Sequence, residues 1–411
     1  MFIFLLNLLN KLKYFPYFVV TTTVYSYGDT CEQIDIANRI AYKKNKKLIL
    51  LHFFIFQKFL KYNICNLSLF NDLVFFKKLS FLDVFFRYIF QILVNIDFIF
   101  IRSFVLLADK ISIRVPEFIR FPLIGVGKYI FCDKSFFSKK FNSIKGFPSY
   151  LPTIKIKKNL ELKCKKILLD KIGNKKFVCL HVRDGVFYKD HKRRPFRNSD
   201  VNNYIPAIKF LIKKGYVIVR LGNKSANQLN FSHKNFFHYN QSSINSKLMD
   251  LFLVKNCEFF IGNHSGPLDL SFMFNKPTLI TNAVSLVHGI AKNKKSLMLL
   301  KKVFFKKKKL DICEFIKLPV DQFNHLTKNN YLTYKQNTKR QLFLVVKEFQ
   351  DLINSKKNFA SHNRNNFNYL IIKELQKKFL LDETARVPIF KLILQWNKSK
   401  GRGFISKLSF N

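Results

Sequence analysis

The chain has 411 residues, which is longer than one hydrophobic core normally supports, so two domains are expected. Hydrophobic residues make up 48% of it and 49 residues are phenylalanine, which excludes an intrinsically disordered protein. The net charge of +47 points to anionic partners, but lysine, phenylalanine, isoleucine and asparagine are enriched together, as A/T-rich coding produces, and basic residues are spread along the chain. We therefore do not expect specific nucleic-acid binding.

The chain has seven cysteines, an odd number without a Cys-x-x-Cys pair, so it predicts neither a disulfide framework nor a zinc site. A reducing cytosol is the simpler setting. Residues 1–13, MFIFLLNLLNKLK, lack the basic start and the cleavage site of a signal peptide, and they are too short to span a bilayer. Two interpretations stay open for them: an interfacial helix, or a helix packed on its own domain.

A βαβ unit is predicted near the start of the chain. Its elements are a strand at 18–25, a loop at 26–30, a helix at about 31–43 and a strand at 47–53. The loop contains Tyr27, Gly28 and Asp29 and would lie at the carboxyl edge of a parallel sheet, where ligands of such sheets bind. Gly28 with Asp29 is a weak signal alone, because many turns use glycine only for geometry.

The remainder of the first half is rich in phenylalanine. Residues 81–101 are apolar enough to suggest a membrane span, but three charged side chains interrupt them, so we predict a buried helix followed by a strand. Prolines and glycines between 116 and 152 indicate a loop-rich segment that leads to a linker between domains. A lysine-rich helix near 158–171 follows.

Strands and helices alternate more regularly in the second half. Strands are predicted within 175–185, at 215–223, 236–239 and 259–261, and after Pro277; helices are predicted at 199–213, 244–255 and 331–354, and a basic tail at 361–411 contains a helix near 367–380. This alternation predicts a parallel, doubly wound α/β sheet with right-handed crossovers. Its carboxyl edge would carry the loops 181–200, 220–229, 240–243, 262–266 and 281–289.

A tight turn at 262–266 joins a buried strand to a short helix and is the first candidate site. Pro267 suits the first helical position, where its missing N–H is not needed, and Gly266 or Ser265 would cap the helix, with Asp269 completing a capping box. Unpaired backbone N–H groups beside the positive end of the helix dipole can hold a phosphate or diphosphate. The alternative is a well-capped helix without a ligand.

The polar loop that follows His181 is the second candidate site. His181 and Arg183 leave the end of a strand on the same face, because they are two residues apart. An arginine can clamp a diphosphate through two hydrogen bonds, and His181 or Asp184 can take a proton from an attacking hydroxyl. The alternative is a hydrogen-bonded core histidine with surface ion pairs. Arg220 and Gly222, at the end of the next strand, would complete one anion-binding crevice.

Four motifs in fixed order carry a resemblance to a known family. HVRDG, RNSD, GYVIVRLGN and FFIGNHSGP, followed by NKPTLITN, resemble a family of bacterial glycosyltransferases from surface-polysaccharide gene clusters. More distantly, the chain is similar to fucosyltransferases that share an H-x-R motif and a GT-B fold. The resemblance covers roughly residues 175–290. The chain departs from the family in its first loop, where Gly28-Asp29 takes the place of a frequent Gly-His pair.

The resemblance implies an α/β, GT-B-like fold with two doubly wound Rossmann-like domains facing across a cleft. The N-terminal acceptor-side domain would cover 1–165, the C-terminal donor domain 166–325, and C-terminal helices with a basic tail 326–411. The implied reaction moves a sugar from a nucleotide-diphosphate sugar to a glycan or lipid-linked acceptor, with inversion and without a cofactor. No Asp-x-Asp pair occurs in the sequence, so no metal ligands are assigned.

The residues carried into this expectation fall into three groups. The candidate bases, in order of preference, are Asp184, His181 and Asp29; the donor-binding residues are Arg183, Arg197, Asn198, Arg220, Gly222, Asn263, Ser265, Gly266, Pro267 and Asn282; the acceptor-side loop contributes Tyr27 and Gly28. Arginines and backbone amides would neutralise the charge that grows on the departing diphosphate.

Three other functions remain open from the sequence. A nucleotide-sugar 2-epimerase of the same fold would release a changed sugar nucleotide without an acceptor. A basic nucleic-acid-binding protein would bind any duplex with a steep salt dependence. A non-catalytic scaffold of a polysaccharide assembly complex is the third. For the enzyme itself we expect a cytoplasmic location, with peripheral contact to an anionic membrane at the inner face of the cytoplasmic membrane.

Overall fold

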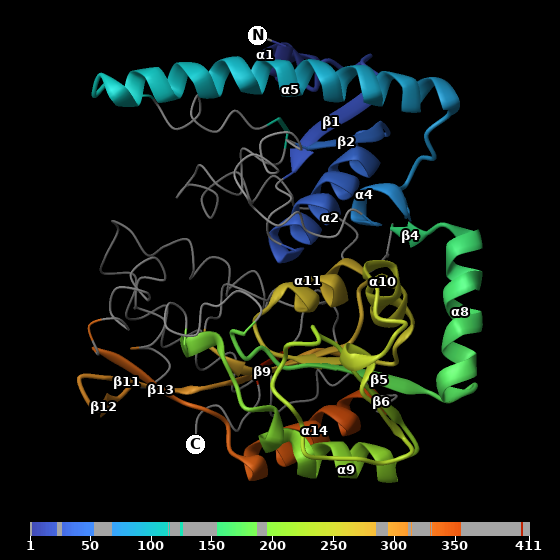
Figure 1. Cartoon of the computed structure of the whole chain (residues 1–411), viewed down its shortest axis with the longest axis vertical. Helices are drawn as coiled ribbons and strands as arrows, with labels where there is room; N and C mark the ends of the chain where they lie inside the picture. The colour runs from blue at the N-terminus through green and yellow to red at the C-terminus, as the bar shows by residue number, and fades with distance from the viewer. Residues whose placement is uncertain are drawn as a thin grey trace. The chain divides into compact units, whose positions relative to one another are not determined.

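The computed structural model describes residues 2–22, 27–52, 68–113, 115, 124–125, 154–186, 195–284, 295–310, 314, 329, 331–354 and 404–405. The chain divides into two compact units, Met1–Glu161 (unit 1) and Leu162–Asn411 (unit 2), each with its own parallel sheet (Figure 1). The predicted interdomain linker and the predicted helix near 367–380 lie outside the described residues.

Unit 2 is built on a seven-stranded parallel sheet in the order β14-β10-β9-β8-β5-β6-β7. Its strands are β5 (Phe177–His181), β6 (Val217–Arg220), β7 (Phe236–Phe237), β8 (Phe260–Gly262), β9 (Thr278–Ala283), β10 (Leu297–Leu300) and β14 (Phe404–Ile405). Leaving out β14 and counting from β5 as strand 1, the order is the 3-2-1-4-5-6 of a Rossmann sheet. The direction of travel across the sheet reverses between β5 and β8, which is its topological switch point.

Helices cover both faces of this sheet, as the alternating pattern predicts (Figure 1). One face carries α9 (Ile205–Lys213) and α14 (Lys339–Asn354), and the other carries α10 (Lys247–Asn256) and α11 (Gly266–Met273). Leu180 of β5 and Ile261 of β8 share a buried cluster with Leu211 of α9 and Val345 of α14. The predicted α/β class and parallel doubly wound sheet are therefore confirmed for unit 2, and the lysine-rich helix is α8 (Lys158–Ile172).

The long helix predicted at 331–354 is wrong in its first part. The strand β13 (Leu332–Lys335) comes first and pairs antiparallel with β11 (Lys302–Phe305), which also pairs with β12 (Lys308–Lys309). The helix α14 begins only at Lys339, because Thr338 and Gln341 form a capping box: Gln341 N donates to Thr338 Oγ1 at 3.2 Å, and Thr338 N donates to Gln341 Oε1 at 3.0 Å.

Unit 1 contains the predicted βαβ arrangement. The strands β1 (Tyr17–Thr22) and β2 (Lys47–His52) pair in parallel and are connected through α2 (Tyr27–Lys43). The loop predicted at 26–30 is wrong from Tyr27 onward, since Tyr27, Gly28 and Asp29 already belong to the first turn of α2. Acidic and hydroxyl residues such as Asp29 and Thr30 favour a helix start, and glycine costs less there than in a helix interior.

Smaller elements complete the described part of unit 1. The short helix α4 (Ser68–Asn71) precedes β3 (Leu73–Val74), which pairs antiparallel with β4 (Lys155–Ile156). The first helix, α1 (Phe2–Leu9), packs beside a much longer helix, α5, through contacts such as that between the rings of Phe2 and Phe90 at 5.7 Å. Within the described residues of unit 1, the parallel sheet has the two strands β1 and β2.

The buried helix and following strand predicted for 81–101 are wrong. They are replaced by one continuous helix, α5 (Phe81–Lys110), of 30 residues. Ser80 and Asp83 start it with a capping box, and no glycine or proline interrupts it before Lys110. Among the described helices, α5 is long and apolar enough, by length and composition alone, to cross a membrane.

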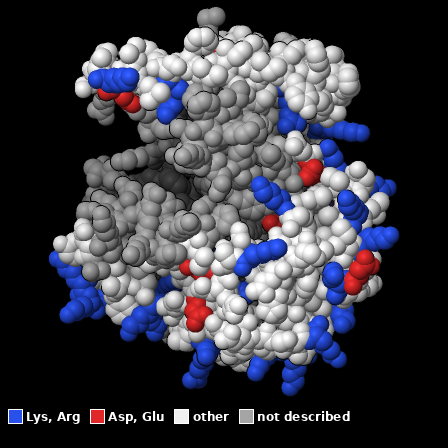
Figure 2. Space-filling view, in the orientation of Figure 1, with Lys and Arg blue, Asp and Glu red and all other residues white. Residues whose placement is uncertain are grey.

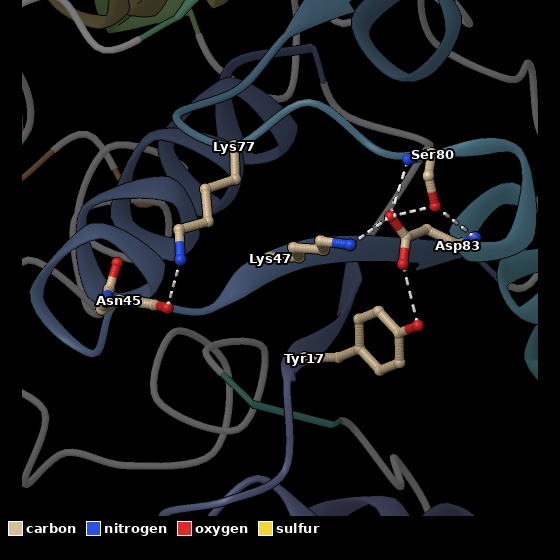
Figure 3. A network of polar contacts seen from close by, with 6 residues as sticks. All are labelled: Tyr17, Asn45, Lys47, Lys77, Ser80 and Asp83. Atoms are coloured by element: carbon tan, nitrogen blue, oxygen red, sulfur yellow. Dashed lines mark hydrogen bonds and ion pairs between the residues drawn. The ribbon is translucent and has the colours of Figure 1, made fainter.

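A polar network fixes the start of α5 to the sheet of unit 1 (Figure 3). Asp83 accepts hydrogen bonds from Tyr17 Oη at 2.9 Å and from the ammonium of Lys47 at 2.6 Å, and also from the backbone N and hydroxyl of Ser80. Burial alone would raise the pKa of Asp83, but these hydrogen bonds lower it below its usual range. The carboxylate is therefore held ionised in a buried position.

Candidate functional site

The candidate site of unit 2 lies at the carboxyl ends of three neighbouring strands, β8, β5 and β6. His181 ends β5 and is paired in register with Gly262, which ends β8. Arg220 ends β6, and its partner in register on β5 is Leu180. These strand ends flank the switch point of the sheet, the place where open α/β sheets bind ligands. The described parts of the loops 181–200, 220–229 and 262–266 are joined here by hydrogen bonds.

A short hydrogen-bond chain fixes the imidazole of His181. Ser265 Oγ lies 2.9 Å from His181 Nδ1 and 3.1 Å from the carbonyl oxygen of Asn263. A carbonyl oxygen only accepts, so the single hydroxyl hydrogen of Ser265 goes to Asn263, and Ser265 Oγ accepts from an N–H at Nδ1. This assignment leaves Nε2 of His181 as the unprotonated ring nitrogen.

The surroundings of His181 keep the ring neutral. Burial lowers its pKa to about 4; Asp184 opposes this shift, while Arg220 and Arg183 add to it. Gly222 lies beside the ring, since a Cβ built on Gly222 would be 4.0 Å from His181 Cδ2. Its φ of +136° is one that other residues rarely adopt, so a side chain at this position would be strained. Gly222 therefore brings backbone, without a side chain of its own, beside Cδ2 of the ring.

Arg183 is positioned by two asparagines. Its backbone N donates to Asn263 Oδ1 at 2.9 Å, and its guanidinium donates to Asn198 Oδ1. The amide of Asn263 also donates to the carbonyl of Arg197 at 3.1 Å and to Ser199 Oγ at 3.2 Å. Asn263 thus connects the turn after β8 to the loop after β5, and its side chain is occupied by this connection.

Two further cations hold the loop around Asn198. Arg197 donates from Nε and Nη2 to the carbonyl oxygen of His264, at 3.3 and 3.1 Å. Lys301, which follows β10, donates to the carbonyl oxygens of Phe196 and Asn198 at 2.9 and 2.6 Å. Burial, with a contribution from Arg183, lowers the pKa of Lys301 to about 8. Each of these contacts is to a neutral oxygen, so it orients a cation without cancelling its charge.

Lys301 was not among the residues singled out from the sequence. It is the first of two lysines that follow the apolar strand LMLL at the same edge of the sheet, and this position is the sequence signal that could have identified it. Its buried ammonium attaches the polar loop after β5 to the far half of the sheet.

Arg220 has an unsatisfied hydrogen-bond donor. Its side chain is 3% exposed, and Nη2 donates to the carbonyl oxygen of Asn227. Nη1 is buried and has no hydrogen-bond partner among the described residues. A buried, unpaired guanidinium N–H costs free energy, and the usual compensation is an oxygen of a ligand or of water. Burial also lowers the pKa of Arg220, while Asp184 raises it.

Asp184 is engaged on both carboxylate oxygens. Oδ1 accepts from the backbone N of Val186 at 3.0 Å, and Oδ2 accepts from the backbone N of Asn227 at 2.6 Å. Asn227 also receives Arg220 through its carbonyl, so Asp184 and Arg220 both fix the loop after β6. Asp184 therefore acts as an anchor between the loop after β5 and the loop after β6.

The helix start at Ser265 differs from the prediction in one respect. Ser265 is the N-cap of α11 and Pro267 occupies its first turn, as predicted, but Ser265 makes no side-chain cap hydrogen bond. The predicted capping box with Asp269 is therefore wrong, because the hydroxyl bonds His181 and Asn263 instead. Because α11 begins at Gly266, the first backbone N–H of the helix follows directly after Ser265, the residue that bonds His181.

Asn282, near the end of β9, is hydrogen-bonded to other residues of unit 2. Its backbone N donates to Asn337 Oδ1 at 2.6 Å, Asn337 N donates to Asn282 Oδ1 at 2.7 Å, and Asn282 Nδ2 donates to Tyr204 Oη at 3.1 Å. Burial raises the pKa of Tyr204 to about 12. These contacts use the groups of Asn282 that could otherwise bind a donor.

The remaining sequence candidates belong to unit 1. Tyr27 and Gly28 lie in the first turn of α2, and the side chain of Asp29 lies outside the described residues. Within the part of the chain that the structure describes, no group of three or more histidine, cysteine, aspartate or glutamate side chains could hold a metal ion. The cationic side chains that the structure places at this edge of unit 2 are those of Arg183, Arg197, Arg220 and Lys301.

Comparisons with known proteins give only distant structural likeness. No family model and no curated protein matches the chain. Among solved structures, the chain is similar to the crystal structure of the dodecameric iron-containing heptosyltransferase TibC in complex with ADP-D-β-D-heptose. The identity is 15% and the TM-score 0.25, and the match covers 45% of this chain and 48% of that chain. This likeness is too distant to indicate the fold or the function of this protein. The Rossmann-type assignment of unit 2 is based on the strand order of its own sheet.

Proposed function

We propose that the protein is a metal-independent glycosyltransferase that uses a nucleotide-diphosphate sugar. The observation that carries the proposal is the meeting of a neutral, oriented histidine, two buried arginines and a helix N-terminus at the switch point of a Rossmann-ordered sheet. That position suits a nucleotide, and the charges there suit its diphosphate. The proposed whole is a GT-B-like enzyme in which unit 2 binds the donor and unit 1 the acceptor.

The leaving group is the part of the substrate that these groups fit best. Arg183 and Arg220 are held by amide and carbonyl oxygens, and Arg220 Nη1 is available for a further acceptor. The first N–H groups of α11 add the positive end of a helix dipole. In a site largely shielded from water, such preorganised donors stabilise the negative charge that develops on a departing diphosphate.

His181 is the preferred base in this proposal. Its Nε2 accepts the proton of the acceptor hydroxyl as that oxygen attacks the anomeric carbon, and the bond from the anomeric carbon to the diphosphate oxygen breaks. The nucleoside diphosphate leaves with the bonding electron pair, and the sugar is transferred with inversion. Asp184 has both oxygens occupied by backbone N–H groups, so the geometry supports His181 over Asp184 as the base.

A glycan or lipid-linked acceptor of surface-polysaccharide synthesis is the proposed second substrate, with the reaction at the cytoplasmic face of the membrane. This part of the proposal rests on the four motifs that resemble the polysaccharide-cluster family.

The first experiment is a thermal-shift screen against UDP-, GDP-, CMP-, ADP- and dTDP-sugars in the presence of EDTA. One nucleotide should raise the melting temperature, and a ligand at 100 times its Kd stabilises by about 2.7 kcal/mol. Arg183→Lys and Arg220→Lys should abolish the shift. Arg340→Lys, the same change at an exposed position of α14, should preserve it.

Product analysis then separates the related functions. Transfer to an acceptor supports the glycosyltransferase, and a changed sugar nucleotide formed without acceptor supports the epimerase. If no sugar nucleotide shifts the melting temperature while duplex DNA does so with a steep salt dependence, the proposal is wrong.

A further inference from the structure

The long helix α5 of unit 1 has an unusual distribution of side chains. Exposed residues recur every three or four positions along it, so they form one stripe on the helix surface. The stripe contains Phe81, Leu82, Phe85, Tyr88, Ile92, Ile96, Ile99, Phe100, Ser103, Phe104, Leu106 and Leu107. None of these residues is charged, and the exposed charged residues Asp109 and Lys110 come only at the end of the helix, so the solvent-facing side of α5 is apolar over most of its length.

Three polar side chains on the opposite face of α5, those of Asp83, Gln91 and Asp97, bind other parts of unit 1. Asp83 bonds Tyr17 and Lys47 of the sheet (Figure 3). Gln91 exchanges hydrogen bonds with the backbone of His52, at the end of β2, and Asp97 Oδ2 accepts from the backbone N of Ile3 at 2.8 Å. These contacts recur along the helix and fix its orientation. An upright, membrane-spanning α5 would have to break all of them.

The helix α1 widens the apolar surface. It packs beside α5, and its own exposed residues Phe4, Leu5 and Leu8 are apolar. Figure 2 shows the region of α5 as a band of mainly white, uncharged atoms, with blue lysine and arginine atoms mostly toward its ends. We name this surface, formed by α1 and the exposed stripe of α5, the α1–α5 face. At 1.5 Å per residue the stripe is about 40 Å long, and extended exposed apolar surfaces mark sites of interaction with proteins, ligands or membranes.

Basic residues frame the α1–α5 face. Lys11 and Lys13 follow α1 and are exposed, Lys78 precedes the start of α5, and Lys110 ends it. Aromatic side chains accompany them: Tyr14 is 90% exposed and Phe81 is 91% exposed. An apolar stripe with a basic and aromatic rim has the composition of a helix that lies in the headgroup region of an anionic bilayer.

We propose that the α1–α5 face binds the surface of an anionic lipid bilayer, with α5 lying in the plane of the membrane. Its apolar stripe enters the boundary between headgroups and acyl chains by about 5–10 Å. Charge favours lipid over a second copy of the chain, because two copies with a net charge of +47 each repel one another. The α1–α5 face would be the surface through which the proposed enzyme contacts the membrane. The observations on α1 and α5 do not depend on whether the protein transfers sugars.

Vesicle flotation tests the proposal without any sugar nucleotide. Full-length protein should float with vesicles of phosphatidylcholine and phosphatidylglycerol and bind pure phosphatidylcholine far less. The double variant Ile92→Glu/Ile96→Glu should lower the partition coefficient at least about 100-fold, since each isoleucine buried in the lipid contributes roughly tenfold or more. The matched control is Leu162→Glu/Leu169→Glu on α8, which makes the same change at two exposed apolar residues and should bind like the wild type.

Depth is measured with a tryptophan probe. Trp396, the only tryptophan of the chain, is replaced by phenylalanine, and Ile96→Trp is introduced on the stripe. Fluorescence of this tryptophan should be quenched by lipids brominated near the headgroup more than by lipids brominated at the chain ends. Circular dichroism of all variants checks that the fold is retained, and binding should be reversed by carbonate at pH 11.

Four results would overturn the proposal. The first is that the wild-type protein does not float with anionic vesicles, and the second is that the double variant floats like the wild type. The third is resistance to carbonate extraction, which indicates a membrane-spanning helix. The fourth is a wild-type dimer in light scattering that Ile92→Glu/Ile96→Glu converts to monomer without any lipid binding, which assigns the face to a second copy. Vesicle binding with no sugar-nucleotide binding would leave this inference intact and refute the proposed function.

Discussion

Replacing Ser265 with alanine removes the hydroxyl that links His181 to the backbone of Asn263. In the wild type, this hydroxyl accepts from His181 Nδ1 at 2.9 Å and donates to the carbonyl of Asn263 at 3.1 Å. The first bond selects the tautomer with a free Nε2, and the second fixes the hydroxyl itself. Without them, the imidazole can carry its proton on either nitrogen, and its orientation loosens.

The size of the effect follows from these two bonds. A hydrogen bond contributes about 0.5–1.5 kcal/mol net, which corresponds to a roughly 2–10-fold change in the fraction of competent tautomer. Added loss of orientation should bring the decrease in kcat to about 5–30-fold, with the KM for the donor little changed. The unpaired N–H and carbonyl should also lower the free energy of unfolding by about 1–3 kcal/mol, or about 2–8 °C in Tm for a unit of this size.

Ser271→Ala is the matched control for this experiment. Ser271 lies on the same helix, is fully buried, and also makes two hydrogen bonds: it donates to the carbonyl of Leu268 at 2.6 Å and accepts from Thr278 Oγ1 at 2.9 Å. It should lose a similar amount of stability and keep its kcat. Initial rates with the donor found in the thermal-shift screen provide the comparison. Equal kcat values for the wild type and Ser265→Ala would refute the role given to this hydrogen-bond chain.

Three further predictions concern charged groups. Arg220→Lys keeps the charge but removes the unpaired Nη1 donor, so kcat/KM for transfer should fall about 10²–10³-fold in initial-rate assays; an unchanged value would separate Arg220 from the reaction. Asp83→Asn removes a carboxylate from the start of α5, where Lys47 pairs with it at 2.6 Å. The free energy of unfolding of unit 1, measured by denaturant titration, should fall by about 2–3 kcal/mol. The control Asp109→Asn, at the other end of the helix, should change it by less than about 0.5 kcal/mol. Burial raises the pKa of Asp250 from 3.8 to about 7, so the folded protein binds its proton more tightly and stability should be lost as pH rises from about 4 to 7, by at most about 4 kcal/mol. Asp250→Asn should flatten that part of the curve of melting temperature against pH, and an unchanged slope would assign it to other groups.

The fold of unit 2 could be predicted because its strands are covered on both faces. Such strands are continuous apolar runs, and FVCLH and VIVR are of this kind, with nearly every residue buried. Helices between them then require a parallel sheet. Strand β14 could not be predicted, because two residues of a basic tail have no periodicity and their pairing with β10 depends on contacts distant in sequence.

Helix α5 shows why the sequence pattern of residues 81–101 leads to the wrong prediction of a buried helix followed by a strand. In the sequence, the charged residues Asp83, Arg87 and Asp97 argue against a membrane span, and in the structure Asp83 and Asp97 bind other residues of unit 1. Between them, Val94 is buried in the core of unit 1, whereas Phe85, Ile92 and Ile96 face outward. Helix α5 is apolar both on the face that packs on unit 1 and on the face exposed to solvent, so hydrophobic periodicity alone does not show how much of it is buried.

The candidate site was predictable in place and less so in its connections. Because polar residues after parallel strands share one edge, His181, Arg183 and Arg220 could be placed together from the sequence. The bond from Ser265 to His181 depends on the register of β5 against β8, which no local pattern contains, so local rules assigned Ser265 to capping its own helix.

The pairing of β14 with β10 has a consequence for biosynthesis. Phe404 follows Leu300 by about a hundred residues, so β10 leaves the ribosome with its outer edge unoccupied. At 5–20 residues per second, the nascent chain carries that open edge for about 5–20 s before its last neighbour is made. During this interval the edge can recruit strands from other nascent chains, so a chaperone that shields it, or slower translation at lower temperature, should raise the yield of soluble protein.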